Sequence, residues 1–244
     1  MTTILVTGGT GTLGRHVTAR LRDAGHEVRV LSRSAQPYAV DLRKGGPALD
    51  RAVADVDVIV HCASTQTGGD EKAAANLIAA ARRANVAHLV YISIVGVDVV
   101  PFGYYKSKLA VEKLVESSGL DWTVLRTTQF HDLVARVLGA AAKLPVLLLP
   151  AGIDDQPIEV AEVADRLAEL AQLPPAGRVA DMGGPEVRSF ADLARTYLKA
   201  TGKRRAVVGV PLGGKTMRAF RAGGHLSPEQ AVGKGTFEEY LARG

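Results

Sequence analysis

The sequence has little cysteine, few aromatic side chains and no long hydrophobic run. Its 244 residues contain one cysteine, Cys62, which excludes a disulfide framework and a thiolate-based zinc or iron–sulfur site. No apolar stretch approaches the roughly 18 residues that a membrane-spanning helix needs. No basic leader precedes the first apolar stretch. We therefore expect a soluble, cytoplasmic protein without a membrane partner.

A large excess of charge of one sign is also lacking. The 30 Lys and Arg residues exceed the 25 Asp and Glu residues by a formal net charge of +5, and they are spread along the chain. Nucleic-acid-binding proteins usually carry a denser basic stripe, so we expect no nucleic-acid partner. The six histidines show no spacing typical of metal ligands, so we expect no metal site.

The first half of the chain alternates short apolar segments with amphipathic ones. We predict strands at residues 3–7, 28–31, 56–60, 88–94 and 121–125, with helices between them. The strands are too apolar to be solvated on one face, which calls for a parallel sheet covered on both sides. We therefore predict an α/β fold with a doubly wound, Rossmann-like parallel sheet.

The pattern loosens after about residue 127. We predict helices at 132–142, 160–171 and 190–200, and strands at 179–182 and 206–210. We expect residues 1–127 to form a dinucleotide-binding core to which later segments return. Residues 128–244 are expected to form a small substrate lobe packed on the sheet.

Glycines gather between the first predicted strand and the first predicted helix, in the segment TGGTGTLG at residues 7–14. Gly8 permits a tight turn, and Gly11 lets the backbone approach a pyrophosphate that sits at the helix N-terminus. Gly14 allows the helix to pack closely against the strand. Because the strand, loop and helix occur in the required order, the segment predicts a dinucleotide-binding loop.

The GxxGxxG spacing and the amino-acid sequence of this loop resemble those of the short-chain dehydrogenase/reductase superfamily, in its extended and atypical branches. Further segments resemble NmrA-like members, and the resemblance covers residues 3–210; these segments are 41–42, 61–64, 91–96, 104–108 and 125–130. The resemblance implies that Asp41 contacts adenine and that residues 62–64 lie along the adenosine half of the cofactor. The full set of predicted cofactor-binding residues is Gly8, Thr10, Gly11, Thr12, Leu13, Gly14, Arg33, Asp41, Cys62, Ala63, Ser64, Lys108 and Thr127.

The choice between NAD(H) and NADP(H) depends on the end of the second strand. NAD-preferring sites place a carboxylate there to bind the ribose 2′-hydroxyl. This sequence has Ser32 and Arg33 instead, about 20 residues after the glycine loop. A guanidinium pairs well with a 2′-phosphate, and Arg15 could add a second contact. We predict a preference for NADP(H) over NAD(H). In the alternative interpretation, Arg33 is a solvent-exposed loop residue that does not contact the cofactor.

Tyr104 and Lys108 are four residues apart, which places them on one face of a helix. The resemblance implies that Lys108 lowers the pKa of the phenol and holds the nicotinamide ribose, while Tyr104 exchanges a proton with a carbonyl or alcohol. It also implies that Ser93 orients the substrate. The neighbouring Tyr105 leaves the identity of the acid open. Many atypical members have lost this triad, so a helix-surface Tyr and Lys without a catalytic part remain an alternative.

Substrate contacts are expected after the sixth strand, because doubly wound folds bind ligands beyond the carboxyl ends of their strands. The candidates are Gln129, Phe130 and His131. We predict an NADPH-dependent oxidoreductase that reduces a small carbonyl, quinone or related electrophile by hydride transfer, as a monomer or homodimer. The alternatives are a catalytically silent, NADP-binding sensor of NmrA type and, less favoured, a nucleotide-sugar epimerase or dehydratase.

Residues 209–216 match GxxxxGK[ST], the phosphate-binding loop of nucleotide hydrolases. Only 28 residues follow Thr216, which leaves no room for a further sheet, and Pro211 removes an N–H from the loop. We therefore interpret this segment as a flexible turn.

Overall fold

The computed structural model describes residues 1–65 and 68–243, and the chain forms two compact units. Unit 1 comprises Met1–Ser93, Gly103–Arg126 and Ala161–Ala180. Unit 2 comprises Ile94–Phe102, Thr127–Val160 and Asp181–Gly244. Each unit is therefore assembled from three separate segments of the chain.

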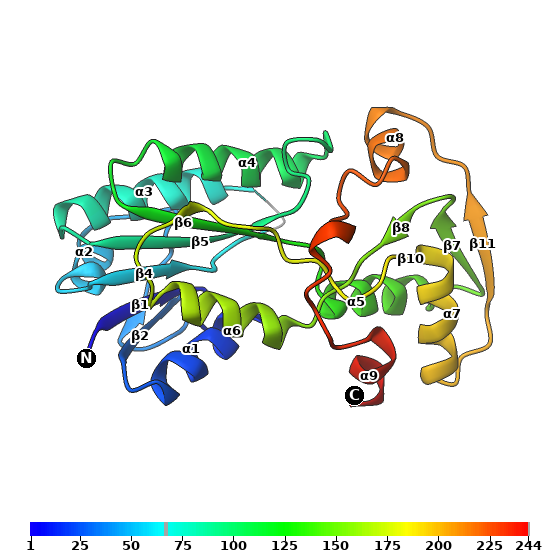
Figure 1. Ribbon diagram of the computed structural model, residues 1–244, viewed down its shortest axis with the longest axis horizontal. Helices are drawn as coiled ribbons and strands as arrows, with labels where there is room; N and C mark the ends of the chain where they lie inside the picture. Colours follow the sequence, from blue (N-terminus) through cyan, green and yellow to red (C-terminus); the bar gives the residue numbers. More distant parts are fainter. Residues whose placement is uncertain (66–67, 244) are drawn as a thin grey trace. The chain divides into compact units, whose positions relative to one another are not determined.

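Unit 1 is built around a seven-stranded sheet with the order β3-β2-β1-β4-β5-β6-β9 (Figure 1). The strands are β1 (Thr3–Thr7), β2 (Glu27–Ser32), β3 (Tyr38–Ala39), β4 (Val58–His61), β5 (His88–Ile94), β6 (Trp122–Thr127) and β9 (Gly177–Arg178). β1 pairs in parallel with both β2 and β4, so the strand order reverses between β1 and β4. The prediction of a doubly wound parallel sheet is confirmed.

Helices cover both faces of this sheet. Figure 1 shows α3 (Asp70–Arg83) and α4 (Gly103–Glu116) on one face, and α1 (Gly14–Asp23) and α6 (Val160–Leu170) on the other. The short α2 (Pro47–Val53) adds Leu49 and Val53 to the core on the α3 side. Two-sided burial explains the continuous apolar strands, since every residue of β4 is buried.

Unit 2 contains two small sheets and several helices. β7 (Val146–Pro150) pairs in parallel with β11 (Ala206–Val210), and β8 (Asp154–Asp155) pairs antiparallel with β10 (Arg188–Ser189). The helices are α5 (His131–Ala141), α7 (Phe190–Ala200), α8 (Lys215–Arg221), the 3-10 helix η1 (Pro228–Gln230) and α9 (Phe237–Ala242). A hydrophobic core joins α5, α7, α9 and β7. In the described part of the chain, no helix has the length and apolar character needed to cross a bilayer.

The structure corrects one expectation from the sequence, confirms another and adds its partner strand. The strand expected at 179–182 is wrong, because β6 pairs with Gly177–Arg178 and Met182 contributes only an isolated bridge to Thr127. The strand at 206–210 forms, but it pairs with β7, a strand that the sequence pattern did not reveal. The helix α4 begins at Gly103, which places Tyr104 and Tyr105 in its first turn.

Candidate functional site

The glycine loop follows β1 at the point where the strand order reverses, which is where doubly wound sheets bind their ligands. Gly8 has a φ of +65°, and a Cβ there would lie 2.8 Å from the Cα of Ala63 in the segment after β4. A Cβ on Gly14 would overlap the carbonyl oxygen of Gly8. Gly8 and Gly14 are therefore required by the fold itself.

Gly11 differs from its two neighbours in the motif. A Cβ on Gly11 would have only the Gly8 carbonyl oxygen within 4 Å, at 3.1 Å, and the φ of Gly11 is not in the left-handed region. Thr10, Gly11 and Thr12 are exposed, whereas Leu13 and Gly14 are buried under the first turn of α1. The loop thus presents an open rim beside a helix N-terminus, an arrangement that suits a pyrophosphate.

A buried hydrogen-bond network holds the segment after β4 against β1. The Thr7 hydroxyl lies 2.7 Å from Nδ1 of His61 and accepts a 3.3 Å hydrogen bond from the Ala63 N–H. Burial lowers the pKa of His61 to about 3, so its ring is neutral at pH 7. Desolvation raises the pKa of the Cys62 thiol to about 12, so Cys62 is protonated and unreactive. The network therefore ties residues 61–63 to the end of β1.

Arg33 directly follows β2 and is exposed, as is Arg15 in α1. Asp41 already has a partner in the protein: Oδ1 accepts hydrogen bonds from the N–H and Nε of Arg43, and Oδ2 accepts one from a terminal nitrogen at 2.8 Å. The hydrogen bond from Arg43 lowers the pKa of Asp41 to about 2. Asp41 is therefore ionised and held by a neighbouring cation.

The hydroxyl of Tyr104 belongs to a chain of hydrogen bonds in unit 1. It lies 3.0 Å from Oγ of Ser64, and Ser64 donates a 2.6 Å hydrogen bond to Oδ2 of Asp70. The other oxygen of Asp70 accepts a 2.8 Å bond from the Thr65 N–H. The hydroxyl of Ser64 has one proton, which it donates to Asp70, so its Oγ accepts from the Tyr104 hydroxyl.

Lys108 lies one turn further along α4 and is buried, with 3% of its surface exposed. Its Nζ donates a 2.6 Å hydrogen bond to the Ile92 carbonyl and lies 4.3 Å from the ring centre of Tyr91. Burial lowers the pKa of Lys108 to about 8, although the nearby Asp70 opposes that shift. The next residue after Ile92 is Ser93, whose buried Oγ has no hydrogen-bond partner among the described residues.

The structure also separates the two candidate tyrosines. Tyr105 is buried, with 3% exposed, whereas Tyr104 is half-buried. Reasoning from sequence missed Asp70 and Tyr91. Asp70 gave one signal, an acidic residue at the start of a helix, but the sequence pattern does not indicate that it contacts Ser64.

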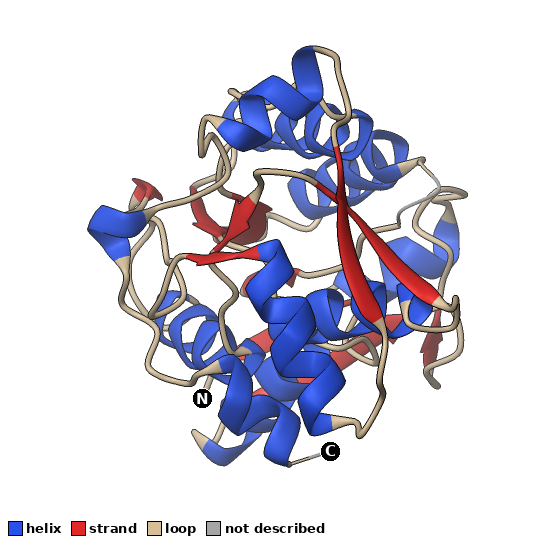
Figure 2. Ribbon diagram, turned by 90° about the vertical axis from the view of Figure 1, so that its right-hand side faces the viewer, coloured by secondary structure: helices blue, strands red, loops and turns tan. Residues whose placement is uncertain are grey.

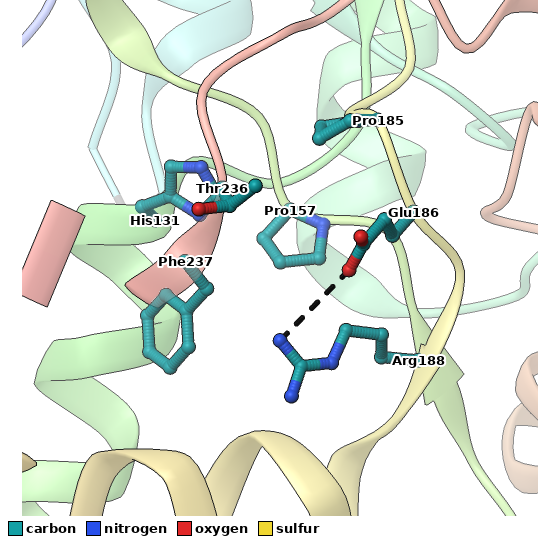
Figure 3. Close-up of a pocket in the computed structure, with 7 residues that line it drawn as sticks. All are labelled: His131, Pro157, Pro185, Glu186, Arg188, Thr236 and Phe237. Atoms are coloured by element: carbon teal, nitrogen blue, oxygen red, sulfur yellow. Dashed lines mark ion pairs between the residues drawn. The ribbon is translucent and has the colours of Figure 1, made fainter. Parts of the chain in front are cut away.

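The predicted substrate residues Gln129, Phe130 and His131 all lie in unit 2. His131 is buried at the start of α5, where its Nε2 donates a 3.0 Å hydrogen bond to the Gly235 carbonyl. Its ring lies against those of Phe237 and Tyr240, at centroid distances of 5.6 and 5.5 Å. Figure 3 shows it in the lining of a small pocket with Pro157, Pro185, Glu186, Arg188, Thr236 and Phe237. Thr127, predicted to contact the cofactor, is buried and accepts a backbone hydrogen bond from Val95.

Comparisons with known proteins identify the family to which the chain belongs. A family model described as NAD(P)H-binding matches residues 8–174. A (4-alkanoyl-5-oxo-2,5-dihydrofuran-3-yl)methyl phosphate reductase of Streptomyces griseus is 36% identical over 52% of this chain, and the match spans about half (48%) of that relative. Quinone oxidoreductase 2 of Escherichia coli is 27% identical over 82% of this chain and 75% of its own length.

Solved structures show the same fold. The Escherichia coli NADPH-dependent quinone oxidoreductase, solved as a complex with NADPH, superposes with a TM-score of 0.82 at 21% identity. The superposition covers 98% of this chain and 99% of that one. At this level of identity the likeness shows a shared fold.

Proposed function

The chain belongs to the NAD(P)H-binding family, and from this premise we propose that it is an NADPH-dependent oxidoreductase that reduces a small carbonyl, quinone or related electrophile. The observation that carries the proposal is the Tyr104 hydroxyl, held by Ser64 on a helix whose next turn carries the buried Lys108. Two relatives with reductase or oxidoreductase names support the reaction class.

The residues of unit 1 fit a dinucleotide in a definite order. The open rim of residues 10–12 at the N-terminus of α1 would hold the pyrophosphate, because Gly11 leaves the approach to the backbone clear. The exposed Arg33, with Arg15, would bind the 2′-phosphate that distinguishes NADPH from NADH. Ser64 would lie along the bound cofactor, which supplies the hydride when present.

Tyr104 would supply the proton in this reaction. Its hydroxyl would give the proton to the oxygen of the reduced group, leaving a phenolate. Because Ser64 donates to Asp70, the Tyr104 proton points to Ser64 at rest and must turn away from it to reach a substrate. A positive charge on Lys108 would stabilise the phenolate, and Ser93 has a hydroxyl available to orient a substrate.

The direct test compares wild-type protein with Tyr104→Phe and Tyr105→Phe, measuring NADPH oxidation with quinones and small carbonyls, and NADPH affinity by titration. We expect Tyr104→Phe to lower turnover by about 100-fold or more, as loss of a general acid does, with little change in NADPH affinity. Tyr105→Phe should retain turnover. Unchanged turnover in Tyr104→Phe would remove this tyrosine from the mechanism.

The cofactor preference has its own test. In Arg33→Glu, the new carboxylate would repel the 2′-phosphate, so NADPH affinity should fall at least about tenfold relative to NADH affinity. Arg22→Glu is the matched control, because Arg22 is also exposed in unit 1 but lies on α1 away from the end of β2. Equal losses in the two variants would rule out a phosphate clamp at Arg33.

A cofactor-binding regulator without turnover is the second candidate. The observation that favours it is the hydrogen bond from Lys108 to the Ile92 carbonyl, which directs the ammonium at the backbone. This candidate predicts that NADPH binds and raises the melting temperature, while no quinone or carbonyl causes its oxidation.

A further inference from the structure

Acidic and basic residues are unevenly distributed along the chain, although the formal net charge is only +5. Residues 133–153 and 193–228, which we call the acid-free region, contain ten of the 30 Lys and Arg residues and none of the 25 Asp and Glu residues. All of the acid-free region lies in unit 2. It has a formal charge of +10, and the rest of the chain has −5.

The fold of unit 2 brings the two segments together. β7 and β11 pair in parallel from Ala206 opposite Val146 to Val210 opposite Pro150, so both strands start at one edge. Lys143 precedes β7, and Lys203, Arg204 and Arg205 precede β11; Nε of Arg205 donates a 3.1 Å hydrogen bond to the Leu144 carbonyl. All four basic side chains are exposed. Among residues 1–65 and 68–243, none of the ten cations of the acid-free region forms an ion pair with a carboxylate.

The same pair of strands has an apolar surface on both faces. Leu147 and Leu149 are buried in the core of unit 2. On the opposite face Val146, Leu148 and Val208 are 38%, 52% and 44% exposed, and Leu144 beside them is 54% exposed. Figure 2 shows the two strands crossing the front of the view with no helix before them. A solvated strand face normally carries polar side chains, so this open face is unusual for a surface bounded by water.

We propose that the open face of β7 and β11 docks on an anionic lipid bilayer. Leu144, Leu148 and Val208 would enter the boundary between headgroups and acyl chains, and the cations at the strand starts would meet the lipid phosphates. This contact needs no membrane-spanning segment. It departs from the expectation of no membrane partner, which treated the charge as spread along the chain.

Charge and side-chain type favour a lipid bilayer over a second copy of the chain and over single-stranded nucleic acid. A second copy of the chain would bring the same cations close together, which is repulsive. Sites for single-stranded nucleic acid stack bases on aromatic side chains, and neither β7 nor β11 carries one. The proposal is independent of the one for the catalytic site, since it concerns unit 2 residues that the proposed reaction does not use.

Vesicle flotation of the full-length protein tests the charge requirement. Vesicles of phosphatidylcholine alone are compared with vesicles that contain about one third phosphatidylglycerol, at low and at high salt. We expect binding only to the anionic vesicles, weakened by salt. The triple variant Lys203→Gln/Arg204→Gln/Arg205→Gln should bind about 100-fold more weakly, from the typical contribution of each basic residue near an anionic surface.

A matched triple variant separates local from overall charge. Arg22→Gln/Arg51→Gln/Arg82→Gln removes the same charge from exposed positions of unit 1 and should bind almost as the wild type does. NADPH oxidation, or NADPH binding if there is no turnover, together with the melting temperature shows that each variant is folded. Equal losses in the two triple variants would overturn a local docking surface.

The apolar requirement is tested by Leu148→Ser/Val208→Ser, with Leu173→Ser as the control because Leu173 is 45% exposed in unit 1. The double variant should lose binding that persists at high salt, and the control should not. Binding to heparin, a soluble polyanion, is measured for comparison. Absent vesicle binding, equal binding to neutral vesicles, or tighter binding to heparin than to anionic vesicles would each overturn the proposal, and the last would indicate a soluble acidic partner.

Discussion

At the scale of single residues, the glycine loop contains positions that look alike in sequence and differ in structure. Gly14 has no room for a Cβ because the Gly8 carbonyl occupies that space, whereas Gly11 has an open side. One position therefore serves the packing of α1 on β1, and the other is left clear for a ligand. This difference leads to opposite expectations for two identical substitutions.

Gly14→Ala should lower the free energy of unfolding by about 2 kcal/mol, the usual cost of forcing a methyl group into a packed site. Gly11→Ala should lower it by about 1 kcal/mol or less, because its Cβ would meet one atom, the Gly8 carbonyl oxygen at 3.1 Å, yet it should weaken NADPH binding. Urea denaturation without ligand measures the first quantity, and titration with NADPH measures the second. A large loss of stability in ligand-free Gly11→Ala would contradict this assignment.

Lys108 makes stability depend on pH in a predictable direction. Its pKa is about 8 in the folded protein, against 10.5 for a lysine in water, so between these values the unfolded chain binds more protons. The free energy of unfolding should therefore rise as pH increases from 8 towards 10, by about 2–3 kcal/mol at 1.36 kcal/mol per pH unit. The measurement is urea denaturation across this range, with Lys108→Met as the reference that lacks the rise. Parallel curves for the two proteins would show that Lys108 does not titrate there.

At the scale of secondary-structure elements, a buried ion pair joins α4 to β6. A terminal nitrogen of Arg126 lies 2.6 Å from Oε2 of Glu112, with side-chain exposures of 5% and 2%. Nε of Arg126 also donates a 2.9 Å hydrogen bond to Oε1. Because α4 carries Tyr104 and Lys108, this pair helps to set the position of both candidate catalytic side chains.

Glu112→Gln should destabilise the protein by about 3–5 kcal/mol, because it leaves the Arg126 charge buried without its counter-ion. Asp50→Asn is the matched control, since the Arg83–Asp50 pair is exposed and such pairs contribute about 1 kcal/mol or less. Urea denaturation of both variants makes the comparison. Similar losses would mean that burial does not set the strength of the α4–β6 pair.

At the scale of the whole molecule, the chain passes repeatedly between the two units. Residues 161–180 return to unit 1 after unit 2 has begun, and they bring α6 and β9. Val163 and Leu167 of α6 are fully buried. A fragment that ends at residue 127 would expose the sheet face that α6 covers.

We therefore expect a fragment of residues 1–127 to unfold without a cooperative transition and to bind NADPH poorly. A fragment of residues 1–180 retains every segment of unit 1 and should regain a cooperative transition. Thermal denaturation with and without NADPH distinguishes them. A cooperative transition in the shorter fragment would show that α6 is dispensable for unit 1.

Local pattern was enough to predict much of unit 1. The strands at 3–7 and 88–94 have the predicted bounds, and the glycine loop lies between β1 and α1 as expected. These elements depend on contiguous residues, because hydrophobic periodicity and glycine spacing are local properties. β7 was missed because its apolar run gives no sign of its partner, and that partner is β11, some 60 residues later.

The sequence by itself determined the class of fold, the cofactor loop and the spacing of Tyr104 and Lys108. Tertiary structure decided which groups lie beside these residues. Tyr104 lies beside Ser64, which is bonded to Asp70, and Lys108 contacts the Ile92 carbonyl and the Tyr91 ring. In unit 2, tertiary structure placed Arg205 beside the Leu144 carbonyl. The physical reason is that helix and strand patterns repeat over a few residues, whereas burial, pKa shifts and surface charge depend on neighbours brought together from distant segments.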